Sequence, residues 1–144
     1  MSRFKKTPPE GCQRVIPYLG YRDCPAALRF LCDAFGFEER FRYPMPDGKI
    51  GHAELSYQGN VLMLASAWVE AGQVSPLDLE GVHAMVYCYV DDVDAHFERA
   101  RTAGATIIQQ PEDQYGTRSY RALDLEGHRF IFASELAGAT PEAG

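Results

Sequence analysis

The chain has no long apolar run and no apolar stretch behind its basic N-terminus. A membrane-spanning helix needs about 20 consecutive apolar residues, and no segment approaches that length. Arg3, Lys5 and Lys6 are followed by the polar stretch 7–11 instead of the apolar core of a signal peptide. We therefore expect neither a secretory signal nor a membrane anchor.

Positive charge is also scarce. The 144 residues include 14 basic and 20 acidic ones, for a net charge of −6, and the only basic cluster lies in the first six residues. Binding to nucleic acid or to an anionic membrane requires clustered lysine and arginine. Neither kind of partner is expected.

Cysteine is present but unpaired in the sequence. Cys12, Cys24, Cys32 and Cys88 are scattered and form no C-x-x-C motif, which argues against a zinc ribbon or a redox pair. Reduced thiols in a cytoplasmic protein fit this spacing best.

The chain does contain an internal repeat. The segment 59–65, GNVLMLA, returns as 127–133, GHRFIFA. Three glycine pairs share one offset, because 104−36, 116−48 and 127−59 all equal 68. Since glycine marks turns and helix ends, the shared spacing indicates a duplicated unit.

Each copy predicts one helix among four strands, in the order β-α-β-β-β. The first helix begins after Asp23 and ends at Gly36, and the second is capped by Asp91 or Asp92. The first copy predicts strands over 14–21, 37–43, 50–57 and 60–67, and the second near 83–90, 106–110, 117–125 and 128–135. The class is α+β. We expect an arm over 1–13, one domain over 14–135 (module 1, 14–67; linker, 68–82; module 2, 83–135) and a tail over 136–144.

Alternation assigns faces to the last strand of each module. Leu62 and Leu64, like Phe130 and Phe132, are expected under the helices. Met63 and Ile131 should then face the opposite, concave side.

With these elements the chain resembles the vicinal oxygen chelate superfamily, which includes glyoxalases, bleomycin-resistance proteins and extradiol dioxygenases. The resemblance covers about residues 14–135 and rests on the doubled module, the helix opening at 23–28 and the closing segment 124–130, DLEGHRF. It implies that the modules curve eight strands around a cavity, often completed by dimerisation.

The resemblance also locates a metal site, which metal-dependent members build from His, Gln or Glu on the first and fourth strand of each module. Those positions here are Ile16, Met63, Met85 and Ile131. None offers a hard oxygen or nitrogen donor. No metal and no cofactor are expected.

His52 and Glu54 are the strongest catalytic candidates, because they stand two residues apart on one strand and share a face. They could act as a base with its orienting carboxylate or as ligands of a displaced metal, or they could be an ordinary hydrogen-bonded pair. Among the other histidines, His83 is expected at the rim of the cavity and His96 on the exposed side of its helix. His128 is expected on the side of its strand that faces the helices. None of the three is given a functional role.

A further set of residues could contact a ligand. Apolar side chains would form the floor of the site, tyrosine hydroxyls its edge, arginine would bind an anionic group and Trp68 could cover the opening. This set comprises Tyr18, Arg42, Met63, Trp68, Met85, Tyr87, Arg118, Tyr120 and Ile131. The tyrosines could equally fill the core, the arginines could be solvent-exposed, and Trp68 could serve packing.

These observations favour a cytoplasmic, homodimeric protein that binds a small aromatic or amphipathic molecule without a metal, as bleomycin-resistance proteins do. The alternative is a lyase or isomerase of the glyoxalase or dioxygenase type that uses His52 and Glu54. A third reading is a regulatory module with a vestigial pocket.

Overall fold

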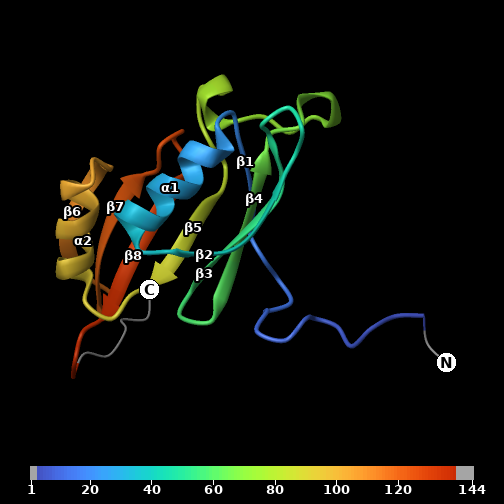
Figure 1. Ribbon diagram of the computed structural model, residues 1–144. Coiled ribbons are helices and arrows are strands. Elements are labelled where there is room, and N and C mark those ends of the chain that lie inside the picture. The colour runs from blue at the N-terminus through green and yellow to red at the C-terminus, as the bar shows by residue number, and fades with distance from the viewer. Residues whose placement is uncertain (1–2, 139–144) are drawn as a thin grey trace.

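Both halves of the chain place one helix between their first and second strands (Figure 1). The structure is a computed structural model that describes residues 3–138, so the predicted tail is covered only to residue 138. The first module contains β1 (Tyr18–Tyr21), α1 (Cys24–Phe35), β2 (Glu38–Pro44), β3 (Ile50–Tyr57) and β4 (Asn60–Ser66). The second contains β5 (Met85–Tyr89), α2 (Val93–Thr102), β6 (Thr106–Gln114), β7 (Thr117–Leu123) and β8 (Arg129–Glu135).

The eight strands form two mixed sheets of four, with the orders β1-β4-β3-β2 and β5-β8-β7-β6. In each sheet the first strand runs parallel to the fourth, and the other pairs are antiparallel. The expected α+β class and the doubled β-α-β-β-β order are confirmed. The eight strands are divided between two sheets, whose edge strands β1 and β5 face each other across the middle of the molecule (Figure 1).

Both helices begin and end where side chains satisfy their free backbone groups. Asp23 accepts a hydrogen bond from the Ala26 amide, and Asp92 does the same for Ala95. Gly36 ends α1 with a φ of 81°, a left-handed conformation that glycine adopts without strain.

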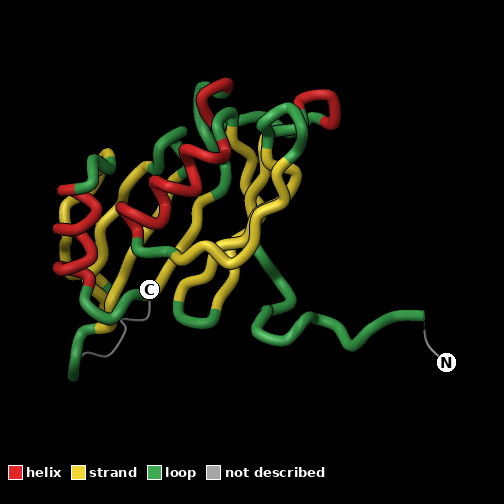
Figure 2. The backbone as a smooth tube through the Cα atoms, in the orientation of Figure 1, coloured by secondary structure: helices red, strands yellow, loops and turns green. Residues whose placement is uncertain are grey.

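The core lies between the helices and one face of the two sheets (Figure 2). Leu28, Leu31 and Phe35 of α1 are buried there, and α1 packs against α2. Leu64 and Phe132 meet the helices from the sheets. The faces predicted for the fourth strands are therefore confirmed.

The segment between the modules contains two short 3-10 helices, η1 (Val69–Ala71) and η2 (Pro76–Asp78). No helix within residues 3–138 has the length and apolar character needed to cross a bilayer.

Candidate functional site

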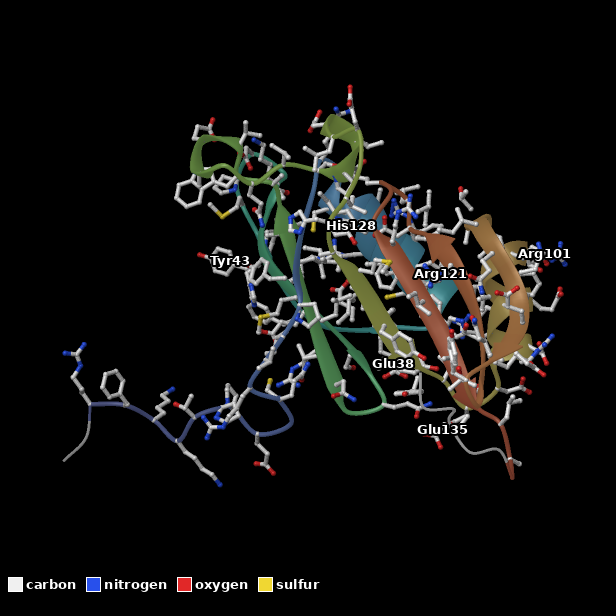
Figure 3. All side chains as sticks on the ribbon, turned by 180° about the vertical axis from the view of Figure 1, so that it is seen from behind. Glu38, Tyr43, Arg101, Arg121, His128 and Glu135 are labelled. Atoms are coloured by element: carbon white, nitrogen blue, oxygen red, sulfur yellow. The ribbon has the colours of Figure 1, made fainter. Side chains whose placement is uncertain are left out.

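The sheet face opposite α1 and α2, which we call the open face, carries large exposed side chains (Figure 3). Tyr18 is 46% exposed, and Tyr87 is 50% exposed. Their neighbours Leu19 and Val86 pack against the core, because successive side chains of a strand point to opposite faces. The open face therefore presents phenol rings that a bound molecule could contact.

Tyr18, His52 and Glu54 form a hydrogen-bonded chain on β1 and β3. Tyr18 Oη lies 2.8 Å from His52 Nδ1, and His52 Nε2 lies 2.9 Å from Glu54 Oε2. The Glu54 carboxylate can only accept, so Nε2–H donates to it. In a neutral ring Nδ1 is then left as the acceptor for the Tyr18 hydroxyl. The structure thus brings together three of the residues predicted for the site.

Arg40 extends this chain. Its Nε lies 3.2 Å from Glu54 Oε1. β2 pairs with β3 through Glu39 opposite Leu55 and then Phe41 opposite Glu54, so Arg40 is the extra residue of a β-bulge. Regular alternation along the strand gives no signal for such a residue, and the sequence did not predict Arg40.

Two aromatic side chains of β2 were also missed. Phe41 lies opposite Glu54, and Tyr43 lies opposite His52. Directly paired residues share a face, so both rings belong to the open face. The signal that could have found them is the pairing of β2 with the strand that carries His52 and Glu54.

Burial raises the pKa of the Tyr18 phenol, with smaller contributions from Cys24 and then from the Glu54 carboxylate. The phenol therefore stays protonated at neutral pH and keeps donating to His52. Its oxygen retains lone pairs that can accept a hydrogen bond from a ligand.

Apolar residues form the floor between these polar groups. Met63 of β4 pairs with Tyr18 on one side and Glu54 on the other. In the second module Ile131 occupies the same place, between Tyr87 and Arg121. The open face thus repeats one arrangement, a tyrosine beside an apolar residue beside a charged one.

This floor does not fit a divalent metal. The four positions that the resemblance assigns to ligands carry isoleucine and methionine, which lack hard donors. His52 and Glu54 bond to each other and to their neighbours. Within residues 3–138, no three His, Cys, Asp or Glu side chains are grouped so that they could hold a metal ion.

A cavity of about 340 Å³ lies between β1 and β5, at the junction of the two modules. Tyr18 and Met85 line it from the two strands. Val74 and Leu79 line it from the linker, and His83, predicted at the rim, also faces it. Trp68 is 66% exposed and contributes nothing to this lining.

Two residues expected at the cavity lie on the helix side of the sheets. Tyr120 is 0% exposed, and its hydroxyl lies 2.6 Å from His96 Nδ1. Arg118 is bound by Asp94 of α2 and Asp113. These placements correct the prediction that both face the cavity.

Their misplacement comes from a change of one residue in the repeat. Ala53 pairs with Leu64, and Tyr120 pairs with Phe132. The offset is 120−53 = 67 on this strand but 132−64 = 68 on the next. Tyr120 therefore corresponds to the core residue Ala53, since a shift of one residue exchanges the faces of a strand.

Arg42 is placed differently from the prediction as well. It lies opposite the core residue Ala53, and its guanidinium binds Glu39. The β-bulge at Arg40 puts Arg40, rather than Arg42, beside Glu54.

The expected exposure of His96 is wrong. His96 is buried with Phe97 on the inner face of α2, and its Nε2 lies 2.7 Å from the Phe35 carbonyl oxygen. Burial lowers the pKa of His96, so the ring is neutral and donates from Nε2 to that oxygen.

The closing segment 124–128 joins the modules. The Glu126 carboxylate accepts hydrogen bonds from the Arg22 and Asp23 amides at the start of α1 and from the Ser75 hydroxyl. Asp124 accepts from the Tyr21 hydroxyl, and burial raises the pKa of Asp124. His128 Nε2 donates to the Gly20 carbonyl oxygen. This motif therefore has a structural role.

Known proteins are similar to this chain in sequence or in fold. The uncharacterised proteins Mb0911c of Mycobacterium bovis and Rv0887c of Mycobacterium tuberculosis are each 36% identical over 120 residues. These alignments cover 81% of this chain and, respectively, 79% and 71% of the relatives.

The crystal structure of TioX from Micromonospora sp. ML1 matches at 35% identity with a TM-score of 0.68, covering 86% of this chain and 99% of TioX. A glyoxalase/bleomycin resistance protein/dioxygenase from Nocardioides matches the fold at 21% identity and a TM-score of 0.67, with coverage of 92% and 89%. The model of the Glyoxalase/Bleomycin resistance protein/Dioxygenase superfamily matches residues 15–132. The chain belongs to this superfamily.

Proposed function

We propose that the protein binds a small aromatic or amphipathic organic molecule between its two modules, without a metal ion. The observation that carries this proposal is the floor of the open face. Met63 and Ile131 occupy positions that the resemblance assigns to metal ligands, and half-exposed Tyr18 and Tyr87 pair with them. An apolar floor with a few polar groups at its edge is typical of small-molecule sites.

Ligand binding is tested by a thermal-shift screen of aromatic antibiotics, hydroxy acids and dicarbonyl compounds against protein treated with a chelator. A ligand at 100 times its dissociation constant stabilises the fold by roughly 2.7 kcal/mol. Tyr87→Ala should weaken binding of a compound found in this way by about tenfold, because an aromatic contact is lost. Tyr115→Ala is the matched control, since Tyr115 is a similarly exposed tyrosine in the turn between β6 and β7. The proposal fails if no compound shifts the transition.

A second candidate function is acid–base catalysis by a lyase or isomerase, favoured by the chain of hydrogen bonds from Tyr18 through His52 to Glu54. A carboxylate that orients an imidazole is a common arrangement for a general base. Its test is exchange of a substrate proton for deuterium, followed by NMR over the hydroxy-acid and dicarbonyl panel. His52→Gln should abolish exchange, and Tyr115→Phe, in the exposed turn between β6 and β7, should leave it unchanged. Equal exchange rates in both variants would rule out this candidate.

We also infer a homodimer in the cytoplasm. Aromatic side chains exposed on β1, β2 and β5 are costly to leave in water, and a second copy could cover them. The cysteines are free, as expected in a reducing compartment. Light scattering at micromolar concentration tests the dimer, and a monomeric mass would contradict it.

A further inference from the structure

Two arginines on the open face lack a hydrogen-bonding or ionic partner among residues 3–138. They are Arg121 of β7 and Arg129 of β8. Other arginines of the chain are neutralised locally, as Arg22 is by Asp78 and Arg118 is by Asp94 and Asp113. An unpaired guanidinium keeps its donors available for an anion.

The register places these two side chains close together. Arg121 lies opposite Ile131, and Arg129 lies opposite Leu123, so the arginines are diagonal neighbours on adjacent strands. Diagonal neighbours are about 7–8 Å apart at Cα, within reach of long side chains. The intervening Phe130 is in the core, so both arginines point to the open face, where Figure 3 labels Arg121.

The cavity beside Arg129 contains donors and no carboxylate. Arg129 lines the cavity between β1 and β5 together with His83 and Gln73, and none of the lining residues is acidic. The Gln73 side-chain oxygen accepts from the Trp68 amide, which leaves the Gln73 NH₂ group free to donate. The absence of acid is notable because acidic residues outnumber basic ones, 20 to 14, in the chain as a whole.

One carboxylate lies near this pair on the same face. Glu112 pairs with Ser119, which precedes Arg121 by two residues. Glu112 forms no ion pair with either arginine. The charge of the pair is therefore not neutralised by this neighbour.

We propose that Arg129 and Arg121 bind the carboxylate of the ligand, so that the protein selects aromatic or amphipathic organic acids. The guanidinium fork matches the two oxygens of a carboxylate. Arg129 pairs in register with Met85, and both line the cavity together with Tyr18, so the apolar body of such a ligand would extend from the arginines toward Tyr18. This inference rests on the function proposed above and specifies its ligand class.

The test compares naphthylacetate with the neutral, nearly isosteric naphthylacetamide, using NMR titration of the chelator-treated full-length protein. Because a charge-assisted hydrogen bond is lost with the amide, the acid should bind about tenfold more tightly. Arg129→Gln should remove this preference by weakening the binding of the acid more than that of the amide. Arg121→Gln should reduce it. Arg29→Gln is the control, since Arg29 is an exposed arginine of α1.

The outcomes separate the two proposals. The carboxylate site is supported if the protein prefers the acid and if this preference is reduced or lost in Arg129→Gln and Arg121→Gln but kept in Arg29→Gln. Equal binding of acid and amide, unaffected by Arg129→Gln, overturns the carboxylate site and leaves small-molecule binding intact. Failure of both compounds to bind at millimolar concentration, while other aromatic compounds bind, overturns the selection of organic acids. If no aromatic compound binds at all, both proposals are wrong.

Discussion

His96 lies between the two helices and uses both ring nitrogens. Nε2 donates to the Phe35 carbonyl oxygen, and Nδ1 accepts from the Tyr120 hydroxyl. The neutral ring satisfies both partners, because Nε2 can donate while Nδ1 accepts. Burial lowers the pKa of His96 in the folded state, because a charged ring is disfavoured away from water.

The free energy of unfolding should therefore decrease as the pH falls below about 6.5, the pKa of an unfolded histidine. Below that value the unfolded chain takes up a proton that folded His96 does not accept. The contribution is complete above that pH and is lost on acidification. Urea unfolding at several pH values measures it.

His96→Gln should flatten this dependence, and exposed His83→Gln should leave it as in the wild type. An unchanged slope in His96→Gln would show that other groups cause the dependence.

Tyr18→Phe tests the donor end of the hydrogen-bonded chain. The variant keeps the ring but removes the hydroxyl that His52 holds. Affinity for a ligand found by the screen should fall about fivefold to tenfold, the effect of one hydrogen bond. Isothermal titration calorimetry measures it, with Tyr115→Phe as control. Equal affinities for the two variants would mean that the Tyr18 hydroxyl does not contact the ligand.

At the scale of single residues, alternation along one strand was sufficient to group His52 with Glu54, and the parallel β1–β4 pairing brought Tyr18 beside them. It could not find Arg40, because a bulge adds a residue that breaks the period. Alternation also could not predict the roles of Asp124 and Glu126. Their hydrogen-bond partners Tyr21 and Arg22 are more than 100 positions away in the chain, and Ser75, which also donates to Glu126, lies in the linker.

Among the elements, the hairpin β6–β7 is closed by Tyr115 and Gly116, which both have positive φ, 53° and 78°. Such a turn matches the twist of the strands, and asparagine followed by glycine is its preferred sequence. Tyr115 is exposed, so its side chain contributes little packing.

Tyr115→Asn should consequently raise the free energy of unfolding by about 0.5–1 kcal/mol, because asparagine tolerates the left-handed conformation better. Chemical denaturation measures the change. Tyr115→Val should have the opposite sign, since a β-branched residue is strained at positive φ. Destabilisation by Tyr115→Asn would indicate a packing role for the tyrosine ring.

The helices and most strands could be predicted because caps, glycines and apolar periods are local signals. The faces of β7 could not. Loop lengths differ between the modules, with five residues between β2 and β3 but two between β6 and β7. Because β6 is two residues longer than β2, the net difference is one residue, which changes the offset of β7 and placed Tyr120 and Arg118 on the wrong side.

For the whole molecule, Glu126 is a central connection between the modules. It lies in the second module and accepts from two amides at the start of α1 in the first. A buried carboxylate of this kind leaves three donors unsatisfied if it is removed.

Glu126→Ala should lower the free energy of unfolding by about 3 kcal/mol or more, and Glu126→Gln by a smaller amount because its oxygen still accepts. Glu80→Ala, at an exposed position of the linker, should change it by less than about 0.5 kcal/mol. Equal effects at positions 126 and 80 would contradict the role of Glu126 in joining the modules.

The doubled architecture itself could be predicted because three glycine pairs keep one spacing through the duplication. The division into two sheets whose edge strands β1 and β5 face each other could not, since it depends on contacts between modules that leave no periodic pattern. The cavity between those strands follows from that arrangement, and it is lined by residues from four separate parts of the chain.

The most direct test is calorimetric titration of one aromatic ligand into protein stripped of metal, repeated with a divalent metal added back. Because the floor of the open face offers no hard donors, equal dissociation constants are expected in both conditions, with one ligand per chain. Binding that requires the metal, or a tightly held ion that survives chelation beside His52 and Glu54, would contradict the account.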